Sequence, residues 1–305
     1  MKKYSILLFT LLLTLSSCDY FEKANAVEHK LRKIENNVKT ISREVKAINN
    51  ELTKEQSSAK ESETSSKKKK TSTSQLSSSI LTPKERKDIS ELILYRHAYI
   101  CSYNSEKGIP NWVAWHLTSD HVTGPYKREG IKFHEDEDTP RPWVNTYDYN
   151  RSGYDRGHMC PSGDNKWSQL AQEQSFLMSN MCPQNHNLNT GDWNEMENQC
   201  RKWAKKYGSV DIVCGPIFIG NKHKRIGTHK VMVPEAFFKV VLCREGGKPK
   251  AIGFIYRNTE GNRPKDAYVN SVDDVERITG YDFFSQLPDE VEKRVEKEAN
   301  LSDWN

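Results

Sequence analysis

A stretch rich in serine and lysine sets the strongest limit on how this chain of 305 residues can fold. Residues 53–79 include SSAKESETSSKKKKTSTSQLSSS and have almost no apolar side chain to bury. Such a segment cannot offset the conformational entropy that a chain loses on folding. We therefore predict a flexible linker over residues 53–82, followed by a separate folded domain over residues 83–305.

The residues before this linker carry apolar side chains at alternating spacings of four and three, which is a heptad repeat. The positions are Val27, Leu31, Ile34, Val38, Ile41, Val45, Ile48 and Leu52. Because the stripe is narrow and its surroundings are charged, the pattern favours a coiled-coil stalk over residues 18–52 rather than a helix docked on the main domain. β-Branched residues at the d positions disfavour dimers, so we expect a homo-oligomer, as a trimer or tetramer.

The first residues have the features of an export signal. Lys2 and Lys3 precede an apolar run from Ile6 to Leu15, which is too short to span a bilayer. The run ends in Leu-Ser-Ser-Cys, which resembles a bacterial lipobox, where the cysteine becomes the lipidated first residue of the mature chain. We predict a signal peptide over residues 1–17, lipidation of Cys18, and an extracytoplasmic protein anchored to the cell envelope, at the outer membrane.

Net charge bears on the possible partners, and the predicted location bears on the state of the cysteines. The formal net charge of +5 permits a polyanionic partner without requiring one. An oxidising compartment would favour disulfide pairing in the even set of remaining cysteines. These are Cys101, Cys160, Cys182, Cys200, Cys214 and Cys243.

Residues 83–305 show the patterns of an α+β domain. Alternating or compact apolar runs predict strands in LYRHAYICSYN, NWVAWHLT, VDIVCGPIFI, MVPEAFFKVVLC and AIGFIYRN. Helical spacing in DWNEMENQCRKWAKKYG places Trp193, Met196, Cys200 and Trp203 on one apolar stripe that ends at Gly208. We therefore predict a mainly antiparallel central sheet with few helices.

The segment SGYDRGHMCPSGDNKW, residues 152–167, places an acid, a base and a cysteine around His158. Downstream, Asn189, Trp193 and Glu197 fall at i, i+4 and i+8 on one face of the predicted helix. A regular helix would separate Asn189 from Glu197 by about 12 Å along its axis, too far for both to ligate one ion directly. One direct ligand and one group that holds waters suits Mg²⁺, which gives up water reluctantly.

These residues resemble the DNA/RNA non-specific endonucleases, and the resemblance extends over roughly residues 95–300. The matching residues are Asp155-Arg156-Gly157-His158 followed by Met-Cys-Pro, then Ser179-Asn180, Pro183-Gln184, and Asn189 with Trp193 and Glu197.

The resemblance implies a ββα-metal fold, with Mg²⁺ ligated by Asn189 and with Mn²⁺ able to substitute. It also implies that His158 is the general base, that Glu197 orders waters on the metal, and that Arg156 and Asn180 contact phosphate or shape the site. The implied activity is hydrolysis of DNA and RNA to products with 5′-phosphate ends. An imidazole with an unperturbed pKa near ~6.5 would accept the proton of water at neutral pH.

Two residues near the motif leave their roles open. Arg128 or Lys132 could supply a further phosphate contact upstream of the motif. Asp155 could orient His158 or Arg156, or it could hold the turn through its backbone.

Two other readings compete with a nuclease. His158, Cys160, Cys182 and His186 have the spacing of a zinc site, which would make this a zinc-stabilised protein, but zinc would leave Asn189 without a role. A non-catalytic coiled-coil lipoprotein that binds polyanions would need basic and aromatic residues, but would have no use for a water-deprotonating histidine beside a metal ligand.

Overall fold

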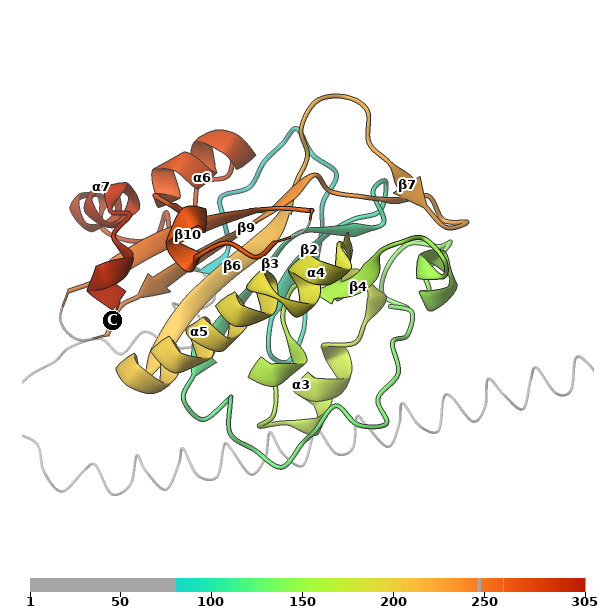
Figure 1. Ribbon diagram of the computed structural model, residues 1–305, viewed down its shortest axis with the longest axis horizontal. Coiled ribbons are helices and arrows are strands. Elements are labelled where there is room, and N and C mark those ends of the chain that lie inside the picture. Colours follow the sequence, from blue (N-terminus) through green and yellow to red (C-terminus); the bar gives the residue numbers. More distant parts are fainter. Residues whose placement is uncertain (1–80, 246–247, 260, 305) are drawn as a thin grey trace, which may run out of the picture. The chain divides into compact units, whose positions relative to one another are not determined.

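The computed structural model describes residues 81–245, 248–259 and 261–304, which belong to one compact unit, Lys70–Asn305 (Figure 1). The signal peptide, the lipidation site Cys18, the coiled coil and most of the linker fall on residues 1–80, outside the described ranges. Within those ranges, every helix is too short or too polar to cross a bilayer.

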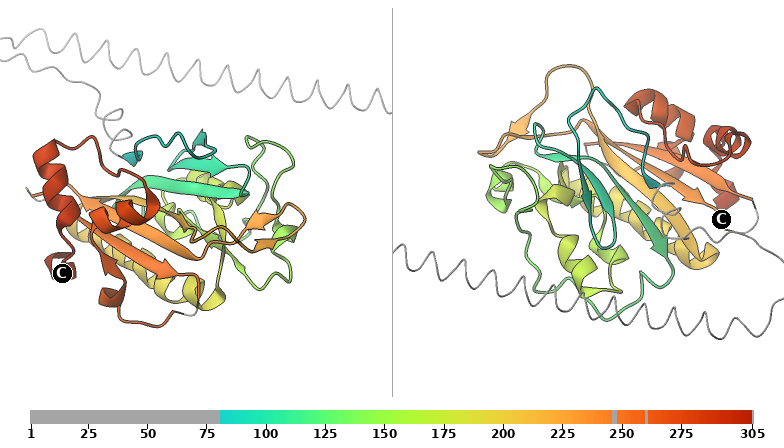
Figure 2. Two further views of the ribbon diagram at one scale, coloured as in Figure 1. Left: turned by 90° about the horizontal axis from the view of Figure 1, so that it is seen from above. Right: turned by 180° about the vertical axis from the view of Figure 1, so that it is seen from behind.

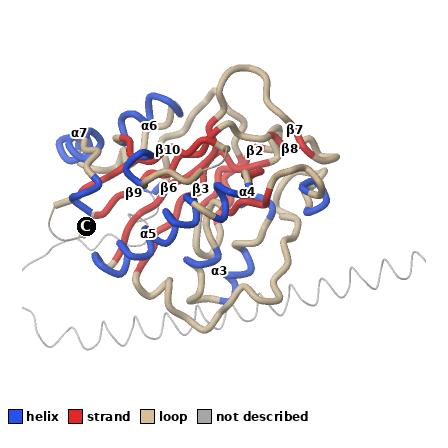
Figure 3. Tube along the Cα trace, in the orientation of Figure 1, coloured by secondary structure: helices blue, strands red, loops and turns tan. Residues whose placement is uncertain are grey.

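A seven-stranded antiparallel sheet forms the centre of the domain (Figure 3), which confirms the predicted sheet. Its strands are β1 (Leu92–Tyr95), β2 (Ile100–Asn104), β3 (Ile109–Thr118), β6 (Ser209–Ile217), β9 (Ala236–Cys243), β10 (Lys250–Arg257) and β11 (Val269–Asn270). They lie in the order β1-β2-β3-β6-β9-β10-β11. All five segments predicted as strands contribute to it.

Helices cover both faces of this sheet (Figures 1 and 2). On one face lie α5 (Asp192–Tyr207) and the short α4 (His186–Thr190), and Trp193 of α5 packs in one core cluster with Val113 of β3. α6 (Val272–Thr279) and α7 (Asp289–Lys297) pack in a second cluster with Ala114 of the same strand. Successive side chains of a strand point to opposite faces, so a sheet covered twice needs apolar residues at nearly every position. This explains the unbroken apolar runs.

The predicted helix that ends at Gly208 is confirmed as α5, and its apolar stripe is buried against the sheet. Gly208 adopts φ 92°, a left-handed conformation that glycine accepts without a steric penalty. The remaining helices are α3 (Gln169–Gln174) and the 3₁₀ turns η2 (Thr146–Tyr149), η3 (Ser162–Asp164), η4 (Met178–Asn180), η5 (Lys265–Tyr268) and η6 (Leu301–Trp304).

Two short hairpins complete the described fold. β7 (Arg225–Ile226) pairs with β8 (Val231–Met232). β4 (Asp155–His158) pairs with β5 (Met181–Gln184), and α4 follows directly, which gives a β-β-α unit. Gly157 in β4 is required here, because a Cβ at this position would lie 2.2 Å from the Gln184 side-chain oxygen.

The cysteines of the described domain form no disulfide, contrary to the pairing that an oxidising compartment would favour. All six are buried free thiols. They pack as core side chains: the Cys101 thiol lies 3.5 Å from the Ser179 carbonyl oxygen, and the Cys214 thiol lies 3.4 Å from the Met159 carbonyl oxygen. Burial raises the pKa of these thiols, so each remains a small apolar group.

Candidate active site

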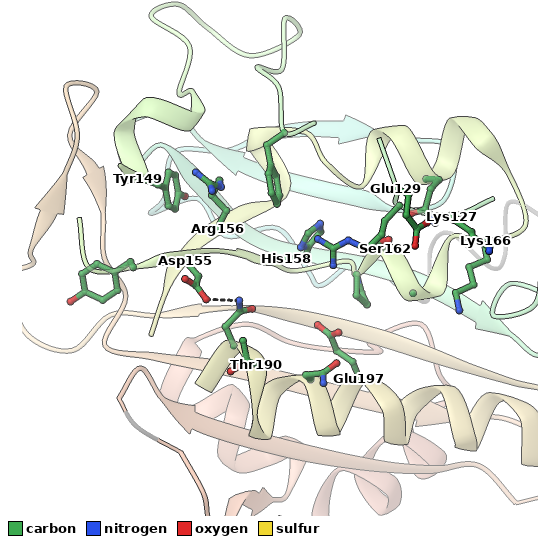
Figure 4. A pocket seen from close by; sticks show the side chains of 18 of the residues that line it. Lys127, Glu129, Tyr149, Asp155, Arg156, His158, Ser162, Lys166, Thr190 and Glu197 are labelled. Atoms are coloured by element: carbon green, nitrogen blue, oxygen red, sulfur yellow. Dashed lines mark hydrogen bonds between the residues drawn. The ribbon is translucent and has the colours of Figure 1, made fainter. Parts of the chain in front are cut away.

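The β-β-α unit opens onto a cleft of about 1030 Å³. Figure 4 shows Asp155, Arg156 and His158 along one wall of this cleft and Glu197 on the helix opposite. Asn189 and Arg201 also line it. The structure therefore brings together four of the five site residues predicted in this domain, His158, Arg156, Asn189 and Glu197.

His158 lies at the end of β4 in an aromatic setting. Its ring centroid is 5.4 Å from that of Phe133 and 5.0 Å from that of Phe176, and its Nε2 atom is buried without a hydrogen-bond partner. Loss of hydration, together with the positive charge of the nearby Arg128 guanidinium, lowers the pKa of His158 to about 3. The site therefore does not leave the imidazole at its unperturbed pKa near ~6.5, and the ring of the free protein is neutral at pH 7.

Asn189 is oriented by Asp155. The Asn189 Nδ2 atom donates a hydrogen bond of 2.9 Å to Asp155 Oδ2, which also accepts from His186 Nδ1 at 2.9 Å. The hydrogen bonds of the Asp155 carboxylate thus go to Asn189 and His186 rather than to His158 or Arg156, the two partners considered from sequence. The bond leaves the amide oxygen as the atom that Asn189 can present to a cation.

The helix that carries Asn189 is not the regular one expected from sequence. α4 ends at Thr190, Gly191 adopts φ −100° and ψ −111°, and α5 then begins at Asp192. A Cβ at Gly191 would lie 2.6 Å from the Asn187 carbonyl oxygen, so this junction needs glycine. The separation of about 12 Å between Asn189 and Glu197, which assumed an unbroken helix, does not apply.

Two basic side chains, those of Lys239 and Arg201, act on the Glu197 carboxyl. Loss of hydration raises the pKa of this carboxyl to about 7, while Lys239 and Arg201 act in the opposite direction. The Lys239 ammonium is completely buried, and it lies 4.2 Å from the centre of the Trp193 ring. Arg201 Nη1 donates to Asp164 at 2.7 Å. Two fixed cations therefore favour the ionised form of Glu197.

Two arginines of the cleft lie over the aromatic rings that surround His158. The Arg156 guanidinium stacks 5.1 Å from the Phe133 ring centre, and the Arg128 guanidinium lies 5.6 Å from that of Phe176. The structure thereby favours Arg128 as the upstream basic residue, since Lys132 does not line the cleft. Both guanidinium groups are placed to meet an anion beside His158.

Asn180 lies behind the cleft. It is completely buried; its amide oxygen accepts from the Cys160 backbone at 2.9 Å, and its amide nitrogen donates to the carbonyls of Cys160 and Ser175, each at 2.8 Å. These bonds fix the backbone two residues beyond His158. The geometry supports the site-shaping alternative for Asn180 over direct phosphate contact.

The set proposed for zinc does not assemble. Cys160 and Cys182 point into the core, whereas the His186 ring is exposed and bonded to Asp155. Across the described residues, the one group of histidine, cysteine and acidic side chains with metal-binding spacing lies elsewhere, at Asp273, Glu276 and Glu296.

Arg201 and Lys239 were missed by the sequence reasoning. Arg201 follows Glu197 by four residues and therefore lies on the same face of α5, which is a readable signal. Lys239 interrupts the apolar run AFFKVVLC. A lone lysine in a doubly buried strand indicates an internal charge partner, although its identity depends on the tertiary fold.

This fold and this site define the ββα-metal class: a short β-β-α unit presents a histidine and an asparagine in one cleft beside an antiparallel sheet. The sequence profile of the DNA/RNA non-specific endonucleases matches residues 76–290, and the chain belongs to that family.

Several nucleases are similar in sequence. "Nuclease EXOG, mitochondrial" from Xenopus laevis is 38% identical over 201 residues, which are 61% of this chain and 56% of the relative. Nuclease C1 from Cunninghamella echinulata is 37% identical over 64% of this chain and 83% of its own. A nuclease from Nostoc is 33% identical over 68% of this chain and 78% of its own. This chain thus spans little more than half the length of the Xenopus relative.

A solved structure agrees with the fold. The crystal structure of the EndoG/EndoGI complex, which concerns inhibition of EndoG, matches with a TM-score of 0.65 and 28% identity. The match covers 72% of this chain and 95% of the other.

Proposed function

We propose that the protein is a Mg²⁺-dependent, sugar-non-specific endonuclease that hydrolyses phosphodiester bonds of DNA and RNA and leaves 5′-phosphate ends. The observation that carries this proposal is the buried, unpartnered Nε2 atom of His158, in the same cleft as Asn189 and Glu197. A buried polar atom without a partner is unfavourable unless a ligand uses it. Family membership supports the same activity.

The residues present fit a hard divalent cation. Asn189 offers an amide oxygen and Glu197 a carboxylate, which are ligand types that Mg²⁺ prefers, and Mn²⁺ accepts the same oxygens. Asn189 would hold the ion directly, and Glu197 would hold it through its water shell. The ion would supply positive charge against the negative charge that develops on the phosphate.

His158 removes the proton from the attacking water. Because its pKa is lowered in the free protein, the imidazole is neutral and ready to accept at Nε2. The phosphodiester then brings a negative charge into the cleft, and this charge raises the pKa of His158 in the complex. Arg156 and Arg128 bind the phosphate with permanent charges and fix its position.

Plasmid degradation tests the activity. The full chain should degrade plasmid DNA in Mg²⁺, and a chelator should stop it. His158→Ala should lower turnover by about 10²–10⁴-fold, the usual size of general-base catalysis. His97→Ala is the matched control, because His97 is exposed and lies outside the cleft. Wild-type turnover in His158→Ala, or equal losses in both variants, would remove His158 from this role.

Substrate range and product ends follow from phosphate recognition. Contacts to phosphate and metal read little base or sugar identity, so DNA and RNA of matched length should both be cut. End labelling with polynucleotide kinase distinguishes the products: labelling that requires prior phosphatase treatment indicates 5′-phosphates. Direct labelling would contradict the proposed ends.

The location and assembly of the protein are part of the proposal. We propose that Cys18 is lipidated and anchors the protein extracytoplasmically to the outer membrane, with residues 18–52 forming a trimeric or tetrameric coiled coil. The lipobox and the heptad repeat support this proposal.

A further inference from the structure

A second group of carboxylates lies on the sheet face that α6 and α7 cover (Figures 1 and 2). One carboxylate oxygen from each of Asp273, Glu276 and Glu296 lies within 4.8 Å of the others. Asp273 and Glu276 come from α6, and Glu296 comes from α7. None of them lines the active-site cleft.

Glu296 is the unusual member. Its side chain points inward from the last turns of α7, the residue is only 7% exposed, and its Oε1 atom is buried without a hydrogen-bond partner. Glu276 is partly satisfied, since its Oε1 accepts from the Phe283 backbone N–H at 2.7 Å. A buried carboxylate oxygen without a partner is costly, because it has given up its water and gained nothing in return.

The surrounding charges do not neutralise this cluster. Asp282 and Glu292 add further negative charge near Glu276 and Glu296. Two basic groups of this region pair with other carboxylates: Lys84 with Asp282 at 3.2 Å, and Arg277 with Asp274 at 2.7 Å. The cluster therefore attracts positive charge.

We propose that Asp273, Glu276 and Glu296 bind a Ca²⁺ ion that ties α7 to α6. Three carboxylates offer up to six hard oxygens, the number and type that Ca²⁺ takes at about 2.3–2.6 Å. Oxygens on opposite sides of such a sphere are about 5 Å apart, which accommodates the spread observed here. Mg²⁺ requires shorter distances of about 2.0–2.1 Å and retains its waters, so Ca²⁺ fits better.

This ion would be structural. α7 packs on the sheet through Val295, which is completely buried beside Glu296, while its outer face carries exposed charges. An ion that contacts both helices would link this C-terminal segment to α6 and hence to β9 and β10. The site would stabilise the domain without touching the nuclease chemistry.

Calcium-dependent thermal unfolding tests the proposal. All proteins carry Asn189→Ala, so that the active-site ion does not contribute, and are stripped with a chelator at pH 8. Ca²⁺ at about 100-fold above its Kd should raise the melting temperature of this parent by about 5–10 °C. Glu296→Gln should lose the shift, and calorimetric titration should then detect no Ca²⁺ binding at this site.

The control is Glu290→Gln, an exposed glutamate of the same helix outside the cluster, which should keep the full shift. Asp273→Asn serves as a second cluster variant if the buried substitution impairs folding. An unresponsive parent, or equal shifts in Glu296→Gln and Glu290→Gln, would overturn the site. Mg²⁺-dependent plasmid cleavage by the single variant Glu296→Gln should match the wild type, so failure of this site and failure of the nuclease are separate results.

Discussion

At the scale of single residues, the surroundings of His158, the proposed base, lower its pKa. They keep the imidazole neutral, and they also make it a weak base. The two aromatic rings beside His158 exclude water and lower its pKa, so a bound proton is unfavourable until an anion arrives. In the proposed mechanism, this arrangement would couple proton acceptance to the presence of substrate. The free protein and the complex should therefore differ in how His158 titrates.

Imidazole titration by NMR measures this difference. In the metal-free protein, the His158 resonance, assigned by comparison with His158→Asn, should show a neutral ring from pH 8 to below pH 5. The unfolded chain binds a proton near ~6.5 and the folded one does not, so His158 also makes stability fall as the pH drops below that value. A folded-state midpoint near 6.5 would contradict the burial argument.

Lys239 is the second residue whose position suggests a role, as a positioning group behind Glu197. Burial lowers the pKa of this lysine, but its neighbours Cys214, Cys200, Glu197 and Asp164 together outweigh burial and raise it. The reciprocal effect is that the ammonium favours an ionised Glu197. Lys239 would thus act on the proposed cation site without entering the cleft, which it does not line.

Lys239→Met should weaken metal use more than it weakens folding. Without the buried cation, Glu197 holds its proton more tightly, and the Mg²⁺ concentration for half-maximal activity should rise about 10–100-fold, as for other groups behind a metal ligand. Excess Mg²⁺ should restore much of the rate. Lys205→Met, an exposed change on α5, is the control. An unchanged Mg²⁺ requirement in Lys239→Met would show that the lysine is only a packing group.

At the scale of elements, the junction between α4 and α5 sets the geometry of the cleft. The bend at Gly191 changes how Asn189 and Glu197 face each other, and the hydrogen bond from Asn189 to Asp155 then fixes the Asn189 side chain. Trp193 and Trp203 of α5 are buried against the sheet and hold the helix in place. The proposed cation site should therefore depend on this backbone feature as much as on its ligands.

Gly191→Ala tests that dependence. The new Cβ would press on the Asn187 carbonyl oxygen, a backbone atom that can move only with α4 and Asn189. A misplacement of about 1 Å costs on the order of 10²-fold in rate, so kcat/KM should fall by that amount. Gly208→Ala, at the far end of α5, should cost about 1 kcal/mol of stability for its left-handed backbone but keep activity. Equal activity in the two variants would refute the role of the bend.

The sequence predicts the helices and strands better than the junctions between them. Apolar periodicity predicts the strands and α5 because burial on both sheet faces requires it. It cannot predict that the i, i+4, i+8 series is interrupted, because the glycine at 191 has meaning only once the Asn187 carbonyl is placed against it. Likewise, Asp155 finds Asn189 only through the fold, 34 residues along the chain. Motif resemblance supplied the site residues, whereas their partners required the tertiary structure.

At the scale of the whole molecule, the chain joins a folded family domain to an N-terminal region with a different composition. The family profile begins at residue 76, after the heptads and most of the serine-rich stretch. The proposed sites of lipid attachment and oligomerisation therefore lie outside the residues that match the family profile. Anchoring and catalysis should be separable.

Cys18→Ser should release the protein from membranes without reducing its specific nuclease activity, because only the thiol accepts the lipid. Fractionation with a lipid label, followed by a nuclease assay on each fraction, measures both properties. The soluble chain without residues 1–18 should still form trimers or tetramers by light scattering at micromolar concentration. Equal labelling of the variant and the wild type would refute lipidation, and a monomer would refute the coiled coil.

The unpaired cysteines of the domain have a practical consequence for a protein expected to be exported. With six thiols sealed in the core, the domain should mature without an oxidase or isomerase, and it should tolerate reducing conditions. The same thiols also report the rate at which the core opens, because an alkylating reagent should modify each thiol only as fast as the core exposes it. Labelling followed by mass spectrometry would time the opening of each part of the core at a named cysteine, without any added probe.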